Sequence, residues 1–361
     1  MEDTAITYKQ GISLIILFIS GSAIIFTPGI AAKQDVWLAT VLAMLFALPI
    51  LLIYERLLYL FPHKDLFDIL QITFGKGIGK IISILYVWFS FHLGYLVLIN
   101  FGDFISIVGL NETPETVSLL CIIVLCIGAV KYGIEVIGRW GEIAVIFLVI
   151  STFILIILSI NNMDINNLKP ILYNGMKPVL KGTFSIFSFP FAELVIFTMV
   201  FTIFKEKGAP KVYRKGLFLG GILILITSVT DILVLGASIA EIYYFPAYAV
   251  ARRINVGEFI QRIEIFTSLV FLIGGIVKIS MCLLAASKGV AKLLNFKDYR
   301  FIVTPIGIMM VNLSIISYES VMEMSKWAVE VWPYYAFLFQ VILPIIILAG
   351  VEVKRKRVKS I

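Results

Sequence analysis

Ten apolar stretches, each long enough to cross a lipid bilayer, follow one another along this chain of 361 residues. A helix needs about 20 mainly apolar residues to cross the hydrocarbon core. We place the spans at residues 11–30, 36–60, 78–105, 115–131, 138–160, 181–204, 216–240, 258–290, 301–319 and 331–351. Because the stretches are continuous rather than alternating, they predict membrane helices and not a transmembrane β-barrel. Charged residues make up 15% of the chain, against about 25% in soluble domains, so we predict one all-α transmembrane domain over residues 1–361.

Two of these spans contain helix-breaking residues at corresponding places in the two halves of the chain. The first span contains Gly21-Ser22 and Thr27-Pro28-Gly29, and the sixth contains Phe187-Ser188-Phe189-Pro190. An unpaired backbone group costs several kcal/mol in lipid, so a break is tolerated only where protein or a cavity receives the freed groups. Paired breaks indicate a solute site near the midplane of an inverted-repeat transporter. We therefore predict ten helices in a five-plus-five inverted repeat, at about 11–160 and 181–351, with helices 1 and 6 broken.

The chemistry of these breaks suits a zwitterion such as an amino acid. Free backbone amides at Gly21 and Ser22 would bind a ligand carboxylate, because the N-terminus of a half-helix favours anions. Phe187, Ser188 and Phe189 would form the opposite wall. The alternative for each break is a helix kink with no ligand.

Lysine and arginine are concentrated in alternate loops, which sets the orientation in the membrane. With the N-terminus in the cytoplasm, the cytoplasmic segments hold most of these residues, including the run Lys354–Lys359 after the last span. An even number of spans then places both termini in the cytoplasm. The net charge of +7 follows this topology, so we expect membrane lipid and not nucleic acid as its partner. The segment Asp65–Phe74 is amphipathic and is expected to lie along the inner membrane surface.

Lys278 is a charged residue in the middle of an apolar span, and such residues are functional candidates because they are rare and costly. Ten residues separate it from Lys288, which is about 15 Å along a helix and places it near the midplane. Gly274-Gly275, one turn earlier, lets another backbone come close. We predict that the ammonium faces carbonyls of the broken first span, where a sodium-coupled relative would hold its ion. There it could couple to protons or act as a fixed cation; a structural ion pair is the alternative.

Two buried carboxylates accompany this lysine. Glu193 follows the break in the sixth span, and three roles are open to it: binding a ligand amine, pairing with Lys278, or capping the amides of the second half-helix. Asp231, at the end of the run Thr227–Asp231, is expected to bond to neighbouring hydroxyls. The sequence contains no metal-ligand cluster, phosphate loop or plausible Ser-His-Asp set. We therefore predict that the protein is not an enzyme and uses no cofactor or metal.

Several motifs together resemble those of the endospore germination permeases, the B subunits of nutrient germinant receptors. They are "GEFIQRIEIF" followed by "LIGGIVKIS", the loop "DINNLKPIL", and the opening "QGISLIILFISGSA" with "TPG" after it. The resemblance covers nearly the whole chain in span number, length and loop placement. It implies the fold of the amino acid–polyamine–organocation transporter superfamily, which is a ten-helix inverted repeat.

The resemblance also implies a function, a location and partners. The chain would be a germinant sensor in the inner membrane of the spore, assembled with a channel-forming A subunit and a lipoprotein C subunit. Its ligand pocket would lie between the first, third, sixth and eighth spans. Carried over by position, with Glu193 and Lys278 added from the argument above, the pocket residues are Gly21, Ser22, Phe89, Leu93, Phe187, Ser188, Glu193, Val277, Lys278 and Ser280.

Two functions remain open from the sequence. One is a sensor that binds a small nutrient, such as an amino acid, and triggers germination without turnover. The other is an active amino-acid transporter, proton-coupled through Lys278. Binding at a midplane site is common to both, and the resemblance favours the sensor.

Overall fold

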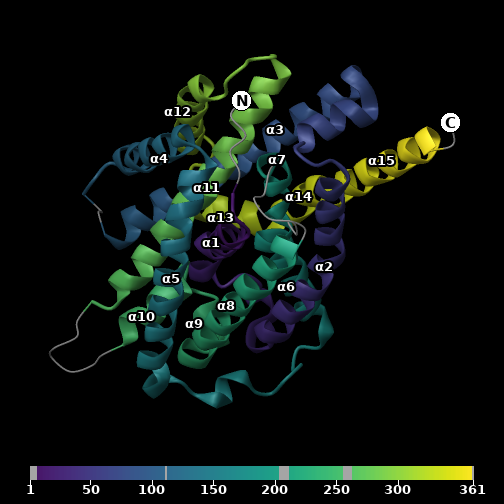
Figure 1. The fold of residues 1–361 in the computed structure, drawn as a ribbon. Helices are drawn as coiled ribbons and strands as arrows, with labels where there is room; N and C mark the ends of the chain where they lie inside the picture. Colours follow the sequence, from purple (N-terminus) through teal and green to yellow (C-terminus); the bar gives the residue numbers. More distant parts are fainter. Residues whose placement is uncertain (1–5, 110–111, 203–210, 255–261, 360–361) are drawn as a thin grey trace.

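The computed structural model describes residues 6–109, 112–202, 211–254 and 262–359, and within these ranges the chain is helical without a β-strand (Figure 1). The α-helices are α1 (Tyr8–Phe26), α2 (Val36–Leu60), α3 (Leu66–Val108), α4 (Glu115–Tyr132), α5 (Ile134–Ser159), α6 (Met176–Ile186), α7 (Ile196–Val200), α8 (Lys211–Leu235), α9 (Ala237–Ala240), α10 (Pro246–Arg253), α11 (Glu264–Leu293), α12 (Arg300–Ile316), α13 (Val321–Glu330), α14 (Trp332–Phe337) and α15 (Leu343–Lys359). The 3-10 helices are η1 (Ile30–Asp35), η2 (Ile160–Asn162), η3 (Ile165–Leu168) and η5 (Ala192–Val195), and the π-helical segments are η4 (Phe187–Phe191) and η6 (Leu338–Ile342).

The predicted spans correspond to helices throughout the described part of the chain. Nine helices there are long and apolar enough to cross a membrane, and the number becomes ten when α12 and α13, which meet at a bend of 104°, are taken as one span. The prediction of ten spans is therefore met, by helix length and composition, when the bent pair counts as one span. The predicted eighth span begins at residue 258, but residues 255–261, with half of the "GEFIQRIEIF" motif, lie outside the described residues.

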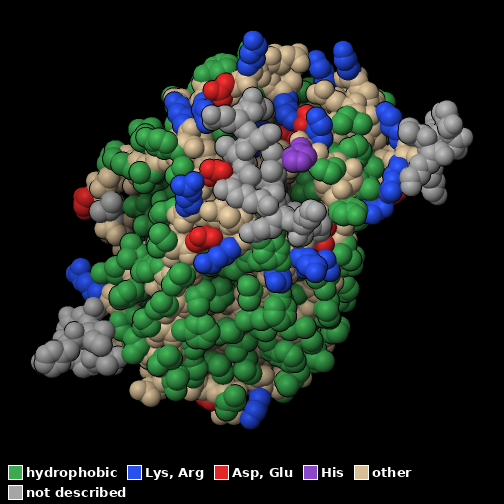
Figure 2. Space-filling view, in the orientation of Figure 1, with side chains coloured by type: hydrophobic (Ala, Val, Ile, Leu, Met, Phe, Trp, Pro, Cys, Tyr) green, Lys and Arg blue, Asp and Glu red, His purple; other side chains and the backbone are tan. Residues whose placement is uncertain are grey.

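The helices divide into a buried centre and an apolar outer layer. In Figure 1, α1 lies in the middle of the molecule with the other helices around it. Most of α1 and of the sixth span is buried, whereas a third or less of the most apolar stretch is buried in the spans that contain α2, α4 and α5. Figure 2 shows a broad belt of hydrophobic side chains below a rim that is rich in lysine and arginine. A lipid-facing belt next to a basic rim is the pattern expected of a membrane protein.

The first span corrects one prediction. A capping box of Thr7 and Gln10 starts α1, and the helix then runs without interruption through Gly21 and Ser22 to Phe26. The predicted break at Gly21-Ser22 is therefore wrong, because the glycine serves close helix packing instead. A Cβ on Gly21 would lie 2.5 Å from the carbonyl of Gly274 in α11. The chain leaves the helix only at Thr27-Pro28-Gly29, where Thr27 and Gly29 have φ of 48° and 79°.

The sixth span is irregular at the predicted place. Between α6 and α7, the chain passes through η4 and η5, and Phe189 has the non-helical angles φ −138° and ψ 109°. Pro190, the next residue, has no amide hydrogen to donate to the preceding turn. Within this stretch, the carbonyls of Ser188 and Ala192 accept hydrogen bonds from side chains of other helices.

α3 also contains a change of direction, at Gly75, which has φ 77°. The amphipathic segment Leu66–Phe74 precedes this residue, and the membrane helix follows it. Lys292 of α11 holds the start of the segment, because its Nζ lies 2.7 Å from Asp65 Oδ1 and 2.6 Å from Asp68 Oδ2. Burial raises the pKa of Asp65, against the opposing effect of Lys292.

Candidate functional site

Lys278 lies in the middle of α11, and its side chain is fully buried. Its Nζ donates a hydrogen bond to Glu193 Oε2 at 2.6 Å and another to Ser22 Oγ at 3.0 Å. Glu193 belongs to η5 and Ser22 to α1. One ammonium therefore joins the first, sixth and eighth spans.

Two aromatic rings complete the surroundings of this ammonium. Lys278 Nζ lies 4.5 Å from the ring centroid of Phe189 and 5.0 Å from that of Phe18, within the range of cation–π attraction. Burying two charges costs several kcal/mol per ion, and only good geometry with further hydrogen bonds offsets that cost. The contacts to Glu193, Ser22 and the two rings supply this compensation.

Two glycines bring α1 and α11 close enough for these contacts. Gly274 faces Gly21, so a side chain on either residue would overlap the backbone of the other helix. Gly275 accommodates the ring of Phe101 from α3 in the same way. The prediction that Gly274-Gly275 permits close approach is confirmed, and the partner that approaches Gly274 is the glycine that had been expected to break the first span.

Lys278 and Glu193 contact each other in this conformation. Lys278 was predicted to face backbone carbonyls of the first span. Its hydrogen bonds go instead to a carboxylate and to the hydroxyl of Ser22, because α1 stays helical at this point and its carbonyls bond within the helix. Of the three roles considered for Glu193, pairing with Lys278 is the one observed. Its other oxygen, Oε1, is buried and has no hydrogen-bond partner among the described residues.

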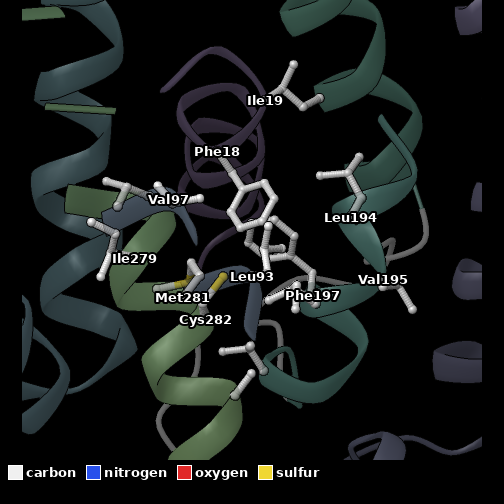
Figure 3. Close-up of a cluster of buried hydrophobic side chains, with 14 of the residues drawn as sticks. Phe18, Ile19, Leu93, Val97, Leu194, Val195, Phe197, Ile279, Met281 and Cys282 are labelled. Atoms are coloured by element: carbon white, nitrogen blue, oxygen red, sulfur yellow. The ribbon is translucent and has the colours of Figure 1, made fainter. Parts of the chain in front are cut away.

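The two predicted residues of the third span differ: Phe89 packs away from Lys278, and Leu93 packs in the same apolar group as Phe18. Phe89 is fully buried and stacks on Phe339 at 4.8 Å and on Trp332 at 5.8 Å, so it faces the tenth span. Leu93 belongs to the apolar packing drawn in Figure 3, together with Phe18, Phe197, Met281 and Cys282. Val277 and Ser280 flank Lys278 on α11 and are buried.

The predicted residues of the sixth span lie where the helix is irregular. Phe187 packs toward Phe337 at 6.4 Å. Ser188 is fully buried, and its carbonyl accepts a hydrogen bond of 2.9 Å from Gln340 Nε2. The hydroxyl of Ser188 and the Oε1 of Gln340 have no partner in the described part of the chain. Unused polar atoms therefore gather between the sixth and tenth spans.

Gln340 is a residue of this region that the sequence argument missed. It is fully buried in η6, the π-helical segment of the tenth span. Pro344, four residues later, has no amide hydrogen for the Gln340 carbonyl. The hydroxyl of Tyr54 replaces that donor at 2.5 Å and also reaches the Ala192 carbonyl at 3.2 Å. A glutamine four residues before a proline inside an apolar span was the signal available in the sequence.

A second buried acid lies apart from this cluster. Asp231 of α8 is 2% exposed and accepts a hydrogen bond of 2.5 Å from Thr27 Oγ1. The prediction that it bonds to the neighbouring hydroxyls of its own run is wrong: Thr227 and Thr230 donate to carbonyls of their own helix, and the donor to Asp231 is Thr27 at the end of the first span. In the described ranges, no group of three or more His, Cys, Asp or Glu side chains is placed to hold a metal ion.

Comparison with known proteins identifies the family. The family model of spore germination proteins, the spore permease family, matches residues 5–321. The chain belongs to this family. It is a B-type spore germination protein, not an enzyme, and an integral membrane protein.

Two relatives from Bacillus subtilis (strain 168) are similar to this permease over most of their length. Spore germination protein KB is 29% identical over 366 residues, which cover 100% of this chain and 98% of that protein. Spore germination protein YndE is 24% identical over 301 residues, which cover 81% of this chain and 82% of that protein. The similarity to protein KB places this permease in the context of a germinant receptor.

Two solved transporter structures share its fold at low sequence identity. One is Mhp1, a nucleobase-cation-symport-1 family transporter in a closed conformation with bromovinylhydantoin bound, with a TM-score of 0.69, 11% identity, and coverage of 95% of this chain and 77% of that one. The other is MhsT in complex with L-phenylalanine, with a TM-score of 0.66, 13% identity, and coverage of 97% and 99%. The permease therefore has a transporter-like helical fold.

Proposed function

We propose that this permease is the ligand-sensing subunit of a spore germinant receptor, and that it binds a small nutrient, an amino acid, where the first, third, sixth and eighth spans meet. The observation that supports this most strongly is the buried cluster of Lys278, Glu193 and Ser22. The cluster ties three spans together through one pair of charges. A ligand that competes for either charge changes how these spans are held, and a sensor needs such a difference in interaction between its states.

An amino acid carries the two charges that this pair could exchange. Its carboxylate would take the place of Glu193 on Lys278, and its ammonium would take the place of Lys278 on Glu193. The unpartnered atoms Glu193 Oε1 and Ser188 Oγ would accept further hydrogen bonds from the ligand. The proposed pocket residues are Gly21, Ser22, Phe89, Leu93, Phe187, Ser188, Glu193, Val277 and Ser280, with Lys278 in the place of a coupling ion. Phe89 and Leu93 are packed in this conformation, so they reach the ligand only if the third span moves.

The proposed architecture around this site is the five-plus-five inverted repeat, with repeats at about 11–160 and 181–351. Its paired breaks would be Thr27–Gly29 in the first span and Phe187–Pro190 in the sixth. The left-handed backbone of Thr27 and Gly29 and the non-helical Phe189 support this assignment. Both breaks belong to spans that are mostly buried, where protein can receive the freed backbone groups.

The cellular setting follows from the receptor context. We propose that the permease lies in the inner membrane of the spore with both termini on the core side. Its partners would be a channel-forming A subunit and a lipoprotein C subunit. The basic run after the last span supports this orientation.

The second candidate function is an active amino-acid transporter, proton-coupled through Lys278. The transporter-like fold favours it, and so does a buried ammonium whose partner a substrate could displace. Counterflow of labelled L-alanine in proteoliposomes separates the two functions. Turnover by the isolated permease supports the transporter, and binding without flux supports the sensor.

Binding measurements on the assembled receptor, with a panel of common L-amino acids as probes, test the site. Lys278→Met and Glu193→Gln each remove one charge, and we expect the affinity for the active amino acid to fall more than about tenfold, equal to 1.4 kcal/mol. The control is Lys288→Met, because Lys288 lies on the same helix but donates to the Val200 carbonyl at 3.2 Å. Unchanged affinity in both test variants would remove the proposed pocket.

A further inference from the structure

Asp231 differs from Glu193 because the structure gives it no positive partner. It lies 2% exposed in α8, and its Oδ2 accepts the hydrogen bond from Thr27 Oγ1. Within the described residues it forms no ion pair. An ionised carboxylate is very costly to bury without a counter-charge, and such a group takes up a proton instead.

The helix that ends beside Asp231 makes its surroundings more negative. α1 finishes at Phe26, with Thr27 as its C-cap. The last carbonyls of a helix have no partner within it and carry partial negative charge. This end of α1 therefore disfavours an ionised Asp231 further.

The charged residues of the neighbouring helices do not balance this charge. On α10, Arg253 donates to the Val234 carbonyl at 3.0 Å. On α11, Lys278 pairs with Glu193, and Glu264 is itself acidic. The charged residues of α5 belong to its first half, at Glu135, Arg139 and Glu142, whereas its last residues, near Ser159, face Asp231.

A small cavity adjoins Asp231 between α1, α5, α8, α10 and α11. Its volume is about 40 Å³, which is room for about two or three waters. Thr152, Ser159, Thr227 and Thr230 contribute to its wall, but their hydroxyls donate to carbonyls of their own helices. Apolar side chains such as Ile24 and Val270 complete the lining.

We propose that Asp231 is a proton-binding site and that it is neutral in this conformation. The cavity leaves room for water next to the carboxyl, which would be the polar partner of that water. A hard metal cation needs about six oxygen ligands. Asp231 is the single carboxylate among the described residues of the wall, and the wall hydroxyls of Thr152, Ser159, Thr227 and Thr230 already donate to carbonyls of their own helices. The site therefore suits a proton better than a metal ion. It is separate from the proposed pocket at Lys278 and does not depend on it.

Infrared spectroscopy of the purified full-length permease in lipid nanodiscs tests the protonation directly. At neutral pH the wild type should show a carboxylic-acid C=O stretching band that is lost in Asp231→Asn. Glu193→Gln is the matched control, and it should leave this band in place because Glu193 is paired with Lys278. Thr27→Val keeps the acid but removes its hydrogen-bond donor, so the band should shift to higher frequency. Thr27→Val therefore identifies the Asp231 band even if Asp231→Asn does not fold.

Thermal stability as a function of pH and salt provides the second readout. The folded wild type holds a proton on Asp231 that the unfolded chain releases, so its stability should fall as the pH rises. Asp231→Asn should show a weaker dependence, and the part that remains belongs to other acids such as Asp65. A wild-type spectrum in which Asp231 contributes a carboxylate band at neutral pH would overturn the proposal. So would stabilisation of the wild type, but not of Asp231→Asn, by sodium chloride relative to choline chloride, because that result would identify a metal cation as the ligand.

Discussion

Glu193 and Asp231 are both carboxyl groups buried among apolar helices, yet their surroundings are opposite. Glu193 has the ammonium of Lys278 at 2.6 Å, whereas Asp231 has a single hydroxyl, that of Thr27, at 2.5 Å. The first acid can remain charged because a cation is buried with it, and the second lacks that compensation. The charge state open to a buried acid in a membrane helix therefore depends on the residue that faces it. That residue is distant in the sequence: Lys278 is 85 residues from Glu193, and Thr27 is 204 residues from Asp231.

Lys278→Met tests the charged site with the largest expected effect. Removing one partner of a buried ion pair leaves an uncompensated charge and costs about 3–5 kcal/mol. We expect a large fall in the melting temperature of the purified permease in detergent. The double variant Lys278→Met with Glu193→Leu should recover most of this loss, since it removes both charges. A double variant as unstable as the single one would show that charge pairing is not the source.

Gly21→Ala tests whether the close approach of α1 and α11 maintains the ion pair. The added Cβ meets the Gly274 carbonyl at 2.5 Å, so the helices must separate, at a cost of about 1–3 kcal/mol. Gly128→Ala is the matched control, because open space surrounds that position. Equal melting temperatures for the two variants would contradict the close packing of the backbones.

Tyr54→Phe tests the irregular backbone near Glu193 without touching a charge. The Gln340 carbonyl would lose its donor, and leaving a buried acceptor unsatisfied costs about 1–3 kcal/mol. The loss should appear as a lower melting temperature and as faster hydrogen exchange in the sixth and tenth spans. Tyr59→Phe is the control, since Tyr59 lies on the same helix and is 64% exposed. A similar result for both tyrosines would argue against this role of the hydroxyl.

Asp231→Asn has the smallest expected effect and sharpens the comparison most. Asparagine resembles the neutral acid in shape and can accept the hydrogen bond from Thr27, so the stability at neutral pH should change by no more than one buried hydrogen bond contributes, about 1 kcal/mol. Glu193→Gln, the same chemical change at the other acid, should cost several times more because Lys278 is left unpaired. Equal melting temperatures for these two variants would remove the distinction between the acids.

The sequence was sufficient for the membrane helices and for the charged residue at the centre. Apolar runs of spanning length predict helices through local physics, and the expense of a lysine in lipid predicts that Lys278 has a compensating partner. The sequence did not identify this partner, because pairing with Lys278 was one of three roles open to Glu193. Whether Glu193 pairs with Lys278 depends on the position of the irregular sixth span relative to α11, which is set by tertiary packing.

Two features could not be obtained from local pattern alone. Gly21 was interpreted as a helix breaker, but a glycine also permits close backbone contact, and only the position of Gly274 decides between these uses. The π-helical segment around Gln340 depends on a hydroxyl from Tyr54, which lies 286 residues earlier in the chain. Nothing near Gln340 in the sequence indicates that donor.

Helix α11 links the Lys278–Glu193 ion pair to the start of the amphipathic segment Leu66–Phe74. Lys278 and Lys292 lie on the same uninterrupted helix, about 21 Å apart at 1.5 Å per residue. Near the C-terminal end of α11, Lys292 forms ion pairs with Asp65 and Asp68, at the start of the segment that changes direction at Gly75. If the proposed ligand exchanges charges at Lys278 and α11 moves in response, the two ion pairs of Lys292 would transmit that movement to the segment Leu66–Phe74.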